Sequence, residues 1–382
     1  MSSKKNLNEN HLVFVVNKAE FFVSHRINLA RAALREGLAV TLACPRPPKE
    51  ILNSLREGSI KWKPISLERE KLKLAALFRV WWQAIKLAYY KKSAIFHLVT
   101  ALPIVLVGPI LRIFNRKIVV AISGLGTVFN KDTGFYRLAK FVVVNLYKFI
   151  LSGANSRLVV QNLDDFDLFR SFGIDESKIS LIKGSGVDPK EYGFNPKTEL
   201  DDVPKILVPA RLLHDKGILE ACKASGLLRS KGIKHKIIFA GTVDRGNPTS
   251  FTEKEIEKLQ SIYEDVSFVG FQADIHKWFL EADIVCLPSY HEGLPRSLIE
   301  AFAIGRPVVA SNVRGCREIV YHEKTGLLAK VKDPKDLADN IQRIIIDKNL
   351  RNTLVHAAYD LFLEELETSK IEKSTVSLYK SL

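Results

Sequence analysis

The chain has 382 residues, of which 47% are apolar and 26% are charged, the balance of a folded globular protein rather than a disordered or fibrous one. That length exceeds what one hydrophobic core usually serves, so we expect two domains. The four cysteines form no C-x-x-C pair and have no histidine at zinc-finger spacing, which argues against a disulfide framework and a structural zinc site.

The net positive charge lies entirely in the first half of the chain. Residues 1–188 carry 29 Lys and Arg against 14 Asp and Glu, whereas residues 189–382 carry 28 of each. The excess is sharpest between Lys71 and Lys131, which holds ten bases and no acid. Because solvated surfaces usually mix both signs, this stretch predicts contact with an anionic partner: nucleic acid, anionic lipid or a phosphorylated substrate.

Apolar strands alternate with amphipathic helices along both halves, which predicts two parallel α/β sheets. The first apolar run, residues 11–16, is too short for a secretory signal and is expected to be a strand. The expected strands are His11–Val16, Ala39–Ala43, Ala94–Leu98, Lys117–Ile122, Arg157–Gln161, Lys205–Pro209, Lys236–Ala240, Ser267–Val269, Ile284–Leu287 and Pro307–Ala310. The expected helices are Ser24–Glu36, Pro103–Phe114, Gly217–Ser230 and Arg296–Ile304.

We expect an N-terminal domain over residues 1–188 and a C-terminal domain over residues 189–360. Residues 361–382 are expected to form a terminal helix that packs back on the first domain. Residues 189–204 contain three prolines and little apolar periodicity, so they are interpreted as the connection. Ligands of such sheets bind beyond the carboxyl ends of the strands, here in a cleft between two facing domains.

Residues 71–92 predict a basic amphipathic helix. Its apolar stripe consists of Leu74, Leu77, Phe78, Trp81, Ile85 and Ala88. The side chains expected to face a membrane are those of Lys73, Arg79, Trp81, Trp82 and Lys86. Such a helix is typical of an element lying in the interface of an anionic bilayer; an ordinary core-facing helix with solvated lysines is the alternative. Pro103, Gly108 and Pro109 interrupt the apolar run that follows, which favours a strand, a loop and a helix over a membrane span.

Two glutamates, Glu292 and Glu300, lie eight residues apart around a Gly-Leu-Pro turn. If a helix begins near Pro295 or Arg296, its free N–H groups can bind phosphate beside Glu292. Glu300, one turn into that helix, could then accept hydrogen bonds from ribose hydroxyls. A loop glutamate and a helix-surface glutamate are the alternative interpretation of the same pair.

With its neighbours, this segment strongly resembles the family 4 retaining glycosyltransferases. The matching motifs are ARLLHDKG (210–217), FAGTVDRGNP (239–248), residues 268–301 and RGCREIV (314–320), with weaker matches in FFVSHR (21–26), ISGLGTVF (122–129) and GSGVD (184–188). The resemblance implies a GT-B fold, in which two Rossmann-like domains face a central cleft and the second domain binds a nucleotide sugar. Within the family, the chain is most similar to the branch that acts on polyprenyl-diphosphate-linked glycans.

Residue by residue, the resemblance implies that Arg211, Lys216 and Glu292 are the catalytic residues. It implies that Arg211 and Lys216 bind the donor diphosphate, with Glu292 at the donor sugar and Glu300 at the ribose. Cations beyond a strand end can stabilise charge on a departing diphosphate, which agrees with that assignment. The further residues that it implies at the donor are Gly241, Asn247, Gly293, Leu294, Arg296, Ser297 and Glu318. For Glu318, a helix-start acid favoured by the helix dipole is the alternative.

In the first half, many relatives carry an acidic residue or histidine where this chain has Ser123. Serine cannot serve as a base without a partner, so His97 or His25 could replace it, or the leaving phosphate takes the proton itself. A structural histidine is the alternative for both. Gly124 and Gly126 could bring backbone close to donor or acceptor phosphate.

The expected function is retaining transfer of a sugar, with a UDP-sugar as the expected donor, to a polyprenyl-diphosphate-linked saccharide. The protein is expected in the cytoplasm, peripheral on the inner face of the cell membrane, with no cofactor, no required metal and no nucleic-acid partner. The same fold with a soluble acceptor such as a sugar phosphate is the main alternative. A GT-B epimerase and a non-catalytic basic scaffold that binds lipid or nucleic acid are further alternatives.

Overall fold

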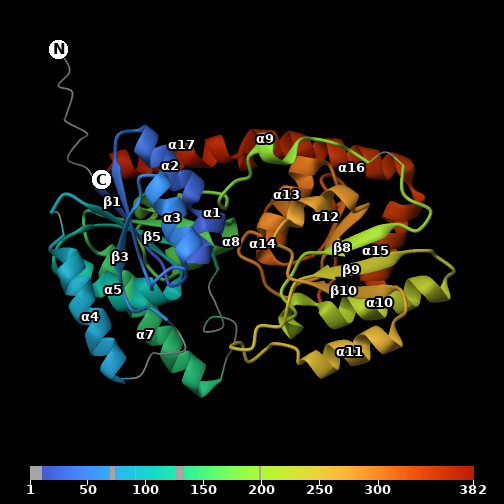
Figure 1. The fold of residues 1–382 in the computed structure, drawn as a ribbon, viewed down its shortest axis with the longest axis horizontal. Helices are drawn as coiled ribbons and strands as arrows, with labels where there is room; N and C mark the ends of the chain where they lie inside the picture. The colour runs from blue at the N-terminus through green and yellow to red at the C-terminus, as the bar shows by residue number, and fades with distance from the viewer. Residues whose placement is uncertain (1–10, 69–73, 91, 125–128, 130–132, 198) are drawn as a thin grey trace, which may run out of the picture. The chain divides into compact units, whose positions relative to one another are not determined.

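The computed structural model describes residues 11–68, 74–90, 92–124, 129, 133–197 and 199–382 (Figure 1). The chain divides into two compact units. Unit 1 comprises Met1–Ser185 and Ile371–Leu382, and unit 2 comprises Gly186–Lys370. Residues 361–370, which the sequence assigns to the terminal helix, lie in unit 2. So do residues 189–204, predicted as a connection, of which Pro189–Tyr192 form helix α9.

Unit 1 is built on a parallel sheet with the strand order β3-β2-β1-β4-β5-β6-β7. Its strands are β1 (His11–Val15), β2 (Ala39–Cys44), β3 (Lys61–Pro64), β4 (Ile95–Val99), β5 (Lys117–Ala121), β6 (Ser156–Val160) and β7 (Ile179–Leu181). β1 pairs with both β2 and β4, so that Val13 lies opposite Thr41 and Phe96. The order reverses between β1 and β4, which makes this pair the switch point of the sheet.

Helices cover both faces of this sheet, because successive strand residues point to opposite sides. One face carries α1 (Ala19–His25), α2 (Ile27–Arg35), α3 (Lys49–Glu57) and the C-terminal helix α17 (Thr368–Lys380), which contributes Ile371, Val376 and Tyr379 to the core. The other face carries α4 (Leu74–Ala88), α5 (Ala101–Ile113), α7 (Gly134–Leu151) and α8 (Leu163–Ser171). The predicted helix Ser24–Glu36 is thus two helices, broken where Arg26 has φ −132°.

Unit 2 has a second parallel sheet with the strand order β10-β9-β8-β11-β12-β13. Its strands are β8 (Lys205–Val208), β9 (Lys236–Ala240), β10 (Val266–Gly270), β11 (Ile284–Leu287), β12 (Val308–Ser311) and β13 (Leu327–Ala329). Its principal helices are α10 (Ile218–Ser230), α11 (Glu253–Ile262), α12 (Ile275–Glu281), α13 (Arg296–Ile304), α14 (Arg314–Arg317), α15 (Pro334–Ile346) and α16 (Lys348–Leu361). The order reverses between β8 and β11, which predicts a ligand site beyond their carboxyl ends.

The two parallel sheets confirm the predicted α/β class. Three strands, β3, β7 and β13, were not predicted, and each has only three or four residues at the edge of a sheet. Short edge strands are difficult to detect because they bury little and therefore show little apolar periodicity. Within the described ranges, no helix is both long enough and apolar enough to cross a membrane.

Candidate functional site

The candidate site in unit 2 lies at the switch point of its sheet. Arg211 and Lys216 follow β8, which ends at Val208, and Glu292 follows β11, which ends at Leu287. Parallel neighbouring strands end at the same edge, so loops 76 residues apart in sequence meet there. The topology therefore brings together motifs that the sequence analysis could only treat one by one.

A partly buried ion pair joins these two loops. The Lys216 Nζ lies 2.6 Å from Glu292 Oε1, and the two side chains are only 19% and 13% exposed. Burial removes much of the water that would screen this pair, so its Coulomb energy is larger than that of a surface pair. The two residues predicted as catalytic from separate motifs are thus in direct contact.

The backbone fixes the position of this pair. Gly217, directly after Lys216, has φ +68°, and a Cβ there would lie 2.1 Å from the carbonyl oxygen of Pro288. The amide of Tyr290 also donates a hydrogen bond to the carbonyl of Asp215, at 2.8 Å. Only glycine allows such a close approach with this conformation, so Gly217 sets the spacing between the loops.

Arg211 has a different environment. Its guanidinium lies 2.7 Å from Asp244 Oδ2, but the arginine side chain is 59% exposed. An exposed pair of this kind contributes little to stability, so Asp244 can release Arg211 to a bound anion at low cost. Asn247 closes the loop that carries Asp244: its Oδ1 accepts from the amide and hydroxyl of Thr249, each at 3.0 Å.

Two further glycines allow segments around the site to pack closely. A Cβ on Gly241 would lie 2.0 Å from the carbonyl oxygen of Ala210, the residue before Arg211. A Cβ on Gly315 would lie 2.0 Å from the carbonyl oxygen of Gly293. Both contacts are with backbone, which cannot move aside as a side chain can, so glycine is required at each position.

Glu300 lies one turn into α13, as predicted, and is only 10% exposed. Its Oε1 accepts from the Tyr192 hydroxyl at 2.7 Å and from Arg296 Nε at 2.8 Å. Burial and, to a lesser extent, the negative charge of Glu300 raise the pKa of Tyr192, so its hydroxyl stays protonated and donates the hydrogen bond. The interpretation of Glu300 as an ordinary helix-surface glutamate is therefore wrong, and Arg296 contacts Glu300.

Among the described residues, the start of α13 has no side-chain cap. Pro295 occupies the N-cap, and its ring cannot supply the oxygen that Ser or Asp would. The amides of Arg296 and Ser297 belong to the first turn of α13, where the helix dipole favours a bound anion. The Leu294 side chain is buried in the core of unit 2, which anchors the turn before them.

Glu318 does not begin a helix. It is the C-cap of α14, whose last residue is Arg317, so the alternative of an acid stabilised by a helix N-terminus is wrong. Its carbonyl accepts a hydrogen bond from the Tyr321 hydroxyl at 3.3 Å.

In unit 1, His97 lies inside strand β4, and it is 2% exposed. Its Nδ1 lies 2.5 Å from the Tyr379 hydroxyl of α17. Burial, followed by the charge of Arg26, lowers the pKa of His97 well below its usual value, so the ring is neutral. These observations do not suit a base that exchanges protons with solvent.

The other predicted residues of unit 1 lie at the carboxyl edge of its sheet. His25 ends α1, with its ring stacked on Phe21 at 4.4 Å and its Nδ1 2.6 Å from Ser24 Oγ. Ser123 and Gly124 follow β5, and Gly124 is exposed. Gly126 lies outside the described residues.

Helix α4 presents its aromatic side chains to solvent. Phe78, Trp81 and Trp82 are 69%, 42% and 60% exposed. Arg79 and Lys86 are exposed as well, and Lys86 Nζ lies 5.3 Å from the Trp82 ring. Lys73 lies outside the described residues. The alternative of an ordinary core-facing stripe is wrong for Phe78 and Trp81, because the helix packs instead through Val80, Ala84, Leu87 and Ala88.

Tyr192 and Asp244 are site residues that the sequence analysis missed. Tyr192 is 108 positions from its partner Glu300, and Asp244 is 33 positions from Arg211. Neither spacing carries a local signal, because the fold alone brings the partners together. Among the residues that the structure describes, no cluster of three or more His, Cys, Asp or Glu side chains could hold a metal ion.

Both halves of the chain match glycosyltransferase families. Residues 192–361 match the family described as glycosyl transferases group 1, and residues 11–162 match glycosyl transferase 4-like. The first match contains every site residue of unit 2 described above, and the second contains the sheet of unit 1 up to β6.

Curated relatives point the same way. The chain is 34% identical, over 63% of its length and 64% of the relative's, to an N,N'-diacetylbacillosaminyl-diphospho-undecaprenol alpha-1,3-N-acetylgalactosaminyltransferase of Campylobacter jejuni. It is 31% identical, over 46% of its length and 44% of the relative's, to the amylovoran biosynthesis glycosyltransferase AmsK of Erwinia amylovora. The alignments thus span less than two thirds of these relatives.

Solved structures share the fold over nearly the whole chain. HepE of Anabaena, in complex with UDP and glucose, has a TM-score of 0.79 at 20% identity, covering 97% of this chain and 99% of HepE. Sucrose-phosphate synthase of Thermosynechococcus elongatus has a TM-score of 0.78 at 19% identity, covering 97% and 98%. Residues 192–361 thus match the group 1 glycosyltransferases, residues 11–162 match the glycosyl transferase 4-like family, and the chain as a whole has the GT-B fold of these solved structures.

Proposed function

We propose that this protein is a retaining glycosyltransferase that transfers a sugar from a UDP-sugar to a polyprenyl-diphosphate-linked saccharide. The observation that carries the proposal is the partly buried Lys216–Glu292 pair, which lies at the switch point of unit 2 near the uncapped start of α13. A cation, a carboxylate and helix amides together suit a sugar joined to a diphosphate. The UDP complex of HepE, a protein of the same fold, supports UDP as the nucleotide.

In this proposal the cations of unit 2 stabilise the leaving group. Lys216 and Arg211 bind the diphosphate, together with the amides of Arg296 and Ser297. All four groups favour the charge that grows as the bond between the sugar and the phosphate breaks. Glu292 orients Lys216 through their ion pair and accepts hydrogen bonds from the sugar. Glu300, held by Tyr192 and Arg296, faces the ribose.

The transfer step itself is proposed to occur on one face of the sugar. The acceptor hydroxyl oxygen forms the new bond to the anomeric carbon while the bond from that carbon to the phosphate oxygen breaks. The hydroxyl proton passes to the departing phosphate oxygen, which becomes more basic as the bond breaks. Buried, neutral His97 is not needed as a base in this scheme. Because attack and departure share one face, the anomeric configuration is retained.

The acceptor is proposed to be a membrane lipid. The name of the Campylobacter jejuni relative describes an acceptor on diphospho-undecaprenol, which supports the same class here. The surface of unit 1 supports it too: exposed apolar side chains on α4 and α7 are Phe78, Trp81, Trp82, Leu138, Phe141, Val142 and Phe149. We call these residues the aromatic surface. Figure 1 shows α4 and α7 on either side of α5, and all three helices pack on one face of the sheet.

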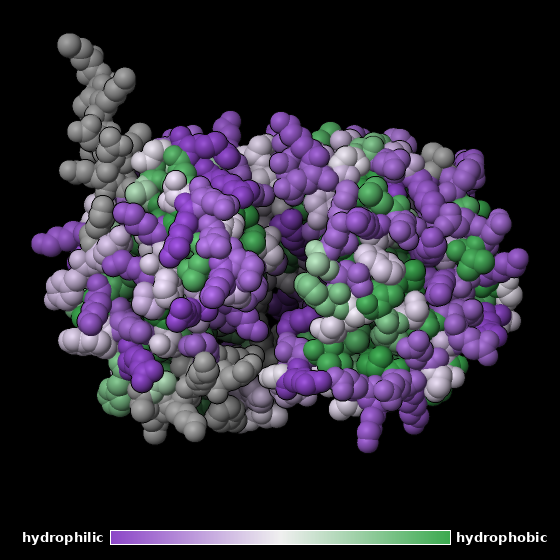
Figure 2. Space-filling view, in the orientation of Figure 1, coloured by the Kyte–Doolittle hydropathy of each residue, from purple (hydrophilic) through white to green (hydrophobic). Residues whose placement is uncertain are grey.

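The charge around the aromatic surface is complementary to an anionic bilayer. Residues 74–163 include no Asp or Glu among those described, whereas Arg79, Lys86, Arg137 and Lys148 are exposed there. Much of the visible face of unit 1 is hydrophilic in Figure 2, whereas the residues of the aromatic surface are apolar and exposed. Apolar side chains that enter the headgroup region and bases that contact anionic lipids together hold a protein at the interface.

The double substitution Trp81→Ala with Trp82→Ala is expected to weaken binding to anionic vesicles by roughly tenfold or more, because two apolar side chains leave the interface. Binding is measured by co-sedimentation with vesicles of phosphatidylglycerol and phosphatidylcholine. Phe271→Ala is the matched control, since Phe271 is a 76% exposed aromatic residue of unit 2. Equal binding by all three proteins would contradict the membrane assignment.

The transfer reaction is tested with purified protein and a panel of UDP-, GDP- and ADP-sugars, with and without a detergent-solubilised polyprenyl-diphosphate saccharide. Turnover of one UDP-sugar that requires the lipid supports the proposal, and NMR of the product reports whether the anomeric configuration is retained. Turnover only with soluble sugar phosphates would contradict the proposal of a lipid acceptor. A product of inverted anomeric configuration would contradict the retaining mechanism.

A further inference from the structure

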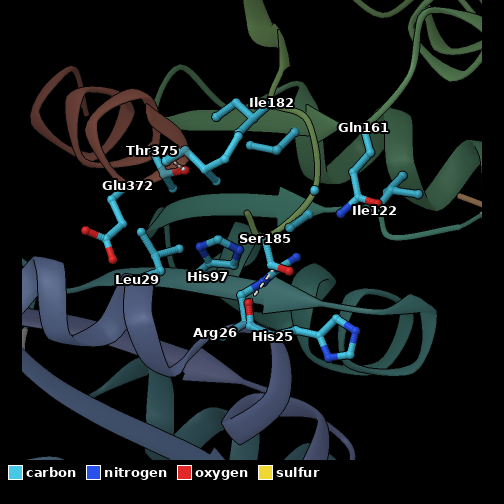
Figure 3. Close-up of a pocket in the computed structure, with 14 residues that line it drawn as sticks. His25, Arg26, Leu29, His97, Ile122, Gln161, Ile182, Ser185, Glu372 and Thr375 are labelled. Atoms are coloured by element: carbon cyan, nitrogen blue, oxygen red, sulfur yellow. Dashed lines mark hydrogen bonds between the residues drawn. The ribbon is translucent and has the colours of Figure 1, made fainter. Parts of the chain in front are cut away.

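Unit 1 contains a small pocket that no step of the proposed reaction uses. It has a volume of about 20 Å³ and is lined by both sheet and helix residues. Its polar side chains include His25, Arg26, His97, Gln161, Ser185 and Thr375 (Figure 3). All belong to unit 1, and Thr375 is supplied by the C-terminal helix α17. The pocket therefore joins the carboxyl edge of the sheet to the last helix of the chain.

Among the described residues, Arg26 is a buried cation without an acidic partner. It is 6% exposed, and a terminal nitrogen donates a hydrogen bond to the His25 carbonyl, at 3.0 Å. Its Nε has no partner, and no described carboxylate lies within ion-pair distance of it. Burial lowers the pKa of Arg26 to about 10, which leaves it charged at neutral pH. Burying a charge costs free energy unless the charge is paired, so a bound anion would stabilise Arg26.

The carboxylate that lines the pocket does not fill this role. Glu372 of α17 binds Arg35 of α2, with 2.7 Å between Arg35 and Glu372 Oε2. Arg35 is 63% exposed and Glu372 is 14% exposed, so an arginine at the solvent edge already occupies this carboxylate. Arg26 and Arg35 are thus two arginines near one pocket, the first buried without an acid and the second exposed with one.

His97 adds a second polar atom without a partner. Its Nε2 makes no hydrogen bond, whereas its Nδ1 contacts the Tyr379 hydroxyl. When that hydroxyl donates to Nδ1, the neutral ring carries its proton on Nε2, which is then a donor. Both residues line the same small pocket, so an anion bound there can offer acceptors to Arg26 Nε and to His97 Nε2.

The remaining polar lining suits the same kind of ligand. Figure 3 shows Ser185 beside Arg26, and Ser185 offers a hydroxyl donor while Gln161 offers an amide. Ser185 is flanked by Gly184 and Gly186, both with positive φ, which lets the backbone turn tightly around the pocket. A volume of about 20 Å³ has room for one or two oxygen atoms.

We propose that the Arg26 pocket of unit 1 binds oxygens of a phosphate group on the acceptor. This inference rests on the proposed function, in which the acceptor carries a diphosphate. The chemistry alone does not separate a lipid diphosphate from a soluble sugar phosphate, so the experiment includes both. Arg26 is then an acceptor-binding residue, and the acceptor phosphate binds at the carboxyl edge of the unit 1 sheet.

The direct test measures binding of inorganic pyrophosphate by calorimetry. The protein carries Arg211→Ala and Lys216→Ala, so that the proposed donor site does not contribute. Adding Arg26→Gln is expected to weaken pyrophosphate binding by roughly tenfold or more, the loss of one charge-assisted contact. Arg35→Gln is the matched control and is expected to leave binding unchanged, because Arg35 points to solvent. Equal binding with and without the Arg26→Gln substitution would overturn the proposal, even if that substitution lowers the Tm.

The kinetic test uses Arg26→Gln in the otherwise unaltered chain. The KM for the acceptor is expected to rise roughly tenfold or more, while the KM for the donor and the rate of donor hydrolysis by water stay unchanged. A rise only for the lipid-linked acceptor, or only for a soluble sugar phosphate, identifies the source of the phosphate. If pyrophosphate binding depends on Arg26 but no acceptor is glycosylated, the pocket stands and the proposed function fails.

A second variant covers the case in which Arg26→Gln does not fold, as judged by circular dichroism. Gln161→Leu removes a donor from the same pocket and keeps the arginine. It is expected to weaken pyrophosphate binding severalfold in the same donor-site background. Unchanged binding in Gln161→Leu, together with no rise of the Tm on adding pyrophosphate to the protein with Arg26 intact, would overturn the proposal.

Discussion

Lys216→Ala is expected to lower the rate of sugar transfer roughly 10²- to 10³-fold, the largest effect of any single side-chain truncation in this protein. The Nζ of Lys216 is a fixed charge in a site with little water, 19% exposed and 2.6 Å from Glu292. A charge held in advance costs little reorganisation when the diphosphate leaves, so it favours the transition state more than the ground state. The loss should therefore appear mainly in kcat rather than in the KM for the donor.

The control is Lys277→Ala, which removes a 76% exposed lysine of the same unit. It is expected to leave transfer within twofold of the unsubstituted protein. Lys216→Ala also leaves Glu292 buried without its partner, so the Tm is measured for both variants to separate misfolding from catalysis. A folded Lys216→Ala protein with full kcat would remove Lys216 from the catalytic residues and with it the main support for the proposed mechanism.

The sequence was sufficient for those parts of the site that are local in the chain. Arg211 and Lys216 follow a short apolar strand, and α13 begins at Arg296, as the Gly-Leu-Pro turn predicts. The Lys216–Glu292 contact could not be predicted from spacing, because it depends on β8 and β11 being neighbours in the sheet. Pairing of strands so far apart in the chain is a property of the whole fold, and no local pattern encodes it.

Helix α4 shows a second limit of sequence patterns. Apolar residues occur nearly all round it, so more than one stripe satisfies the 3.6-residue period. The predicted stripe contains Phe78 and Trp81, yet the buried side consists of Val80, Ala84, Leu87 and Ala88. Small and branched side chains fit closely against α5 and the sheet, whereas the aromatic residues remain on the outside. Phe78, Trp81 and Trp82 are therefore exposed, as contact with a bilayer requires.

His97 illustrates the same difficulty in unit 1. It is a candidate base by residue type alone, but it lies inside β4, and its ring is buried there. The partner that makes this burial tolerable, Tyr379, is 282 positions away on α17. A histidine that is accessible and one that is buried have the same local sequence, and only the contact with the C-terminal helix distinguishes them.

Gly217→Ala is expected to destabilise unit 2 by about 3 kcal/mol and to lower sugar transfer roughly 100-fold. The positive φ of +68° costs an alanine about 1 kcal/mol, and the new Cβ would lie 2.1 Å from the Pro288 carbonyl oxygen, which forces the two loops apart. For a domain of this size, such a loss lowers the Tm by roughly 6–12 °C. Since Lys216 precedes Gly217, the shift also moves its Nζ from Glu292, and small displacements of a catalytic group have large effects on rate.

Gly232→Ala is a matched control at the other end of the same helix. Gly232 lies just beyond α10 and has φ +72°, nearly the value of Gly217, but a Cβ there would meet nothing within 4 Å. We expect a loss of only about 1 kcal/mol, a Tm lower by roughly 2–4 °C, and unchanged transfer. The difference between the variants measures the contact with Pro288 alone, because backbone strain is common to both. If the two alanine variants have the same Tm and the same rate, the close approach of these loops does not set the position of Lys216.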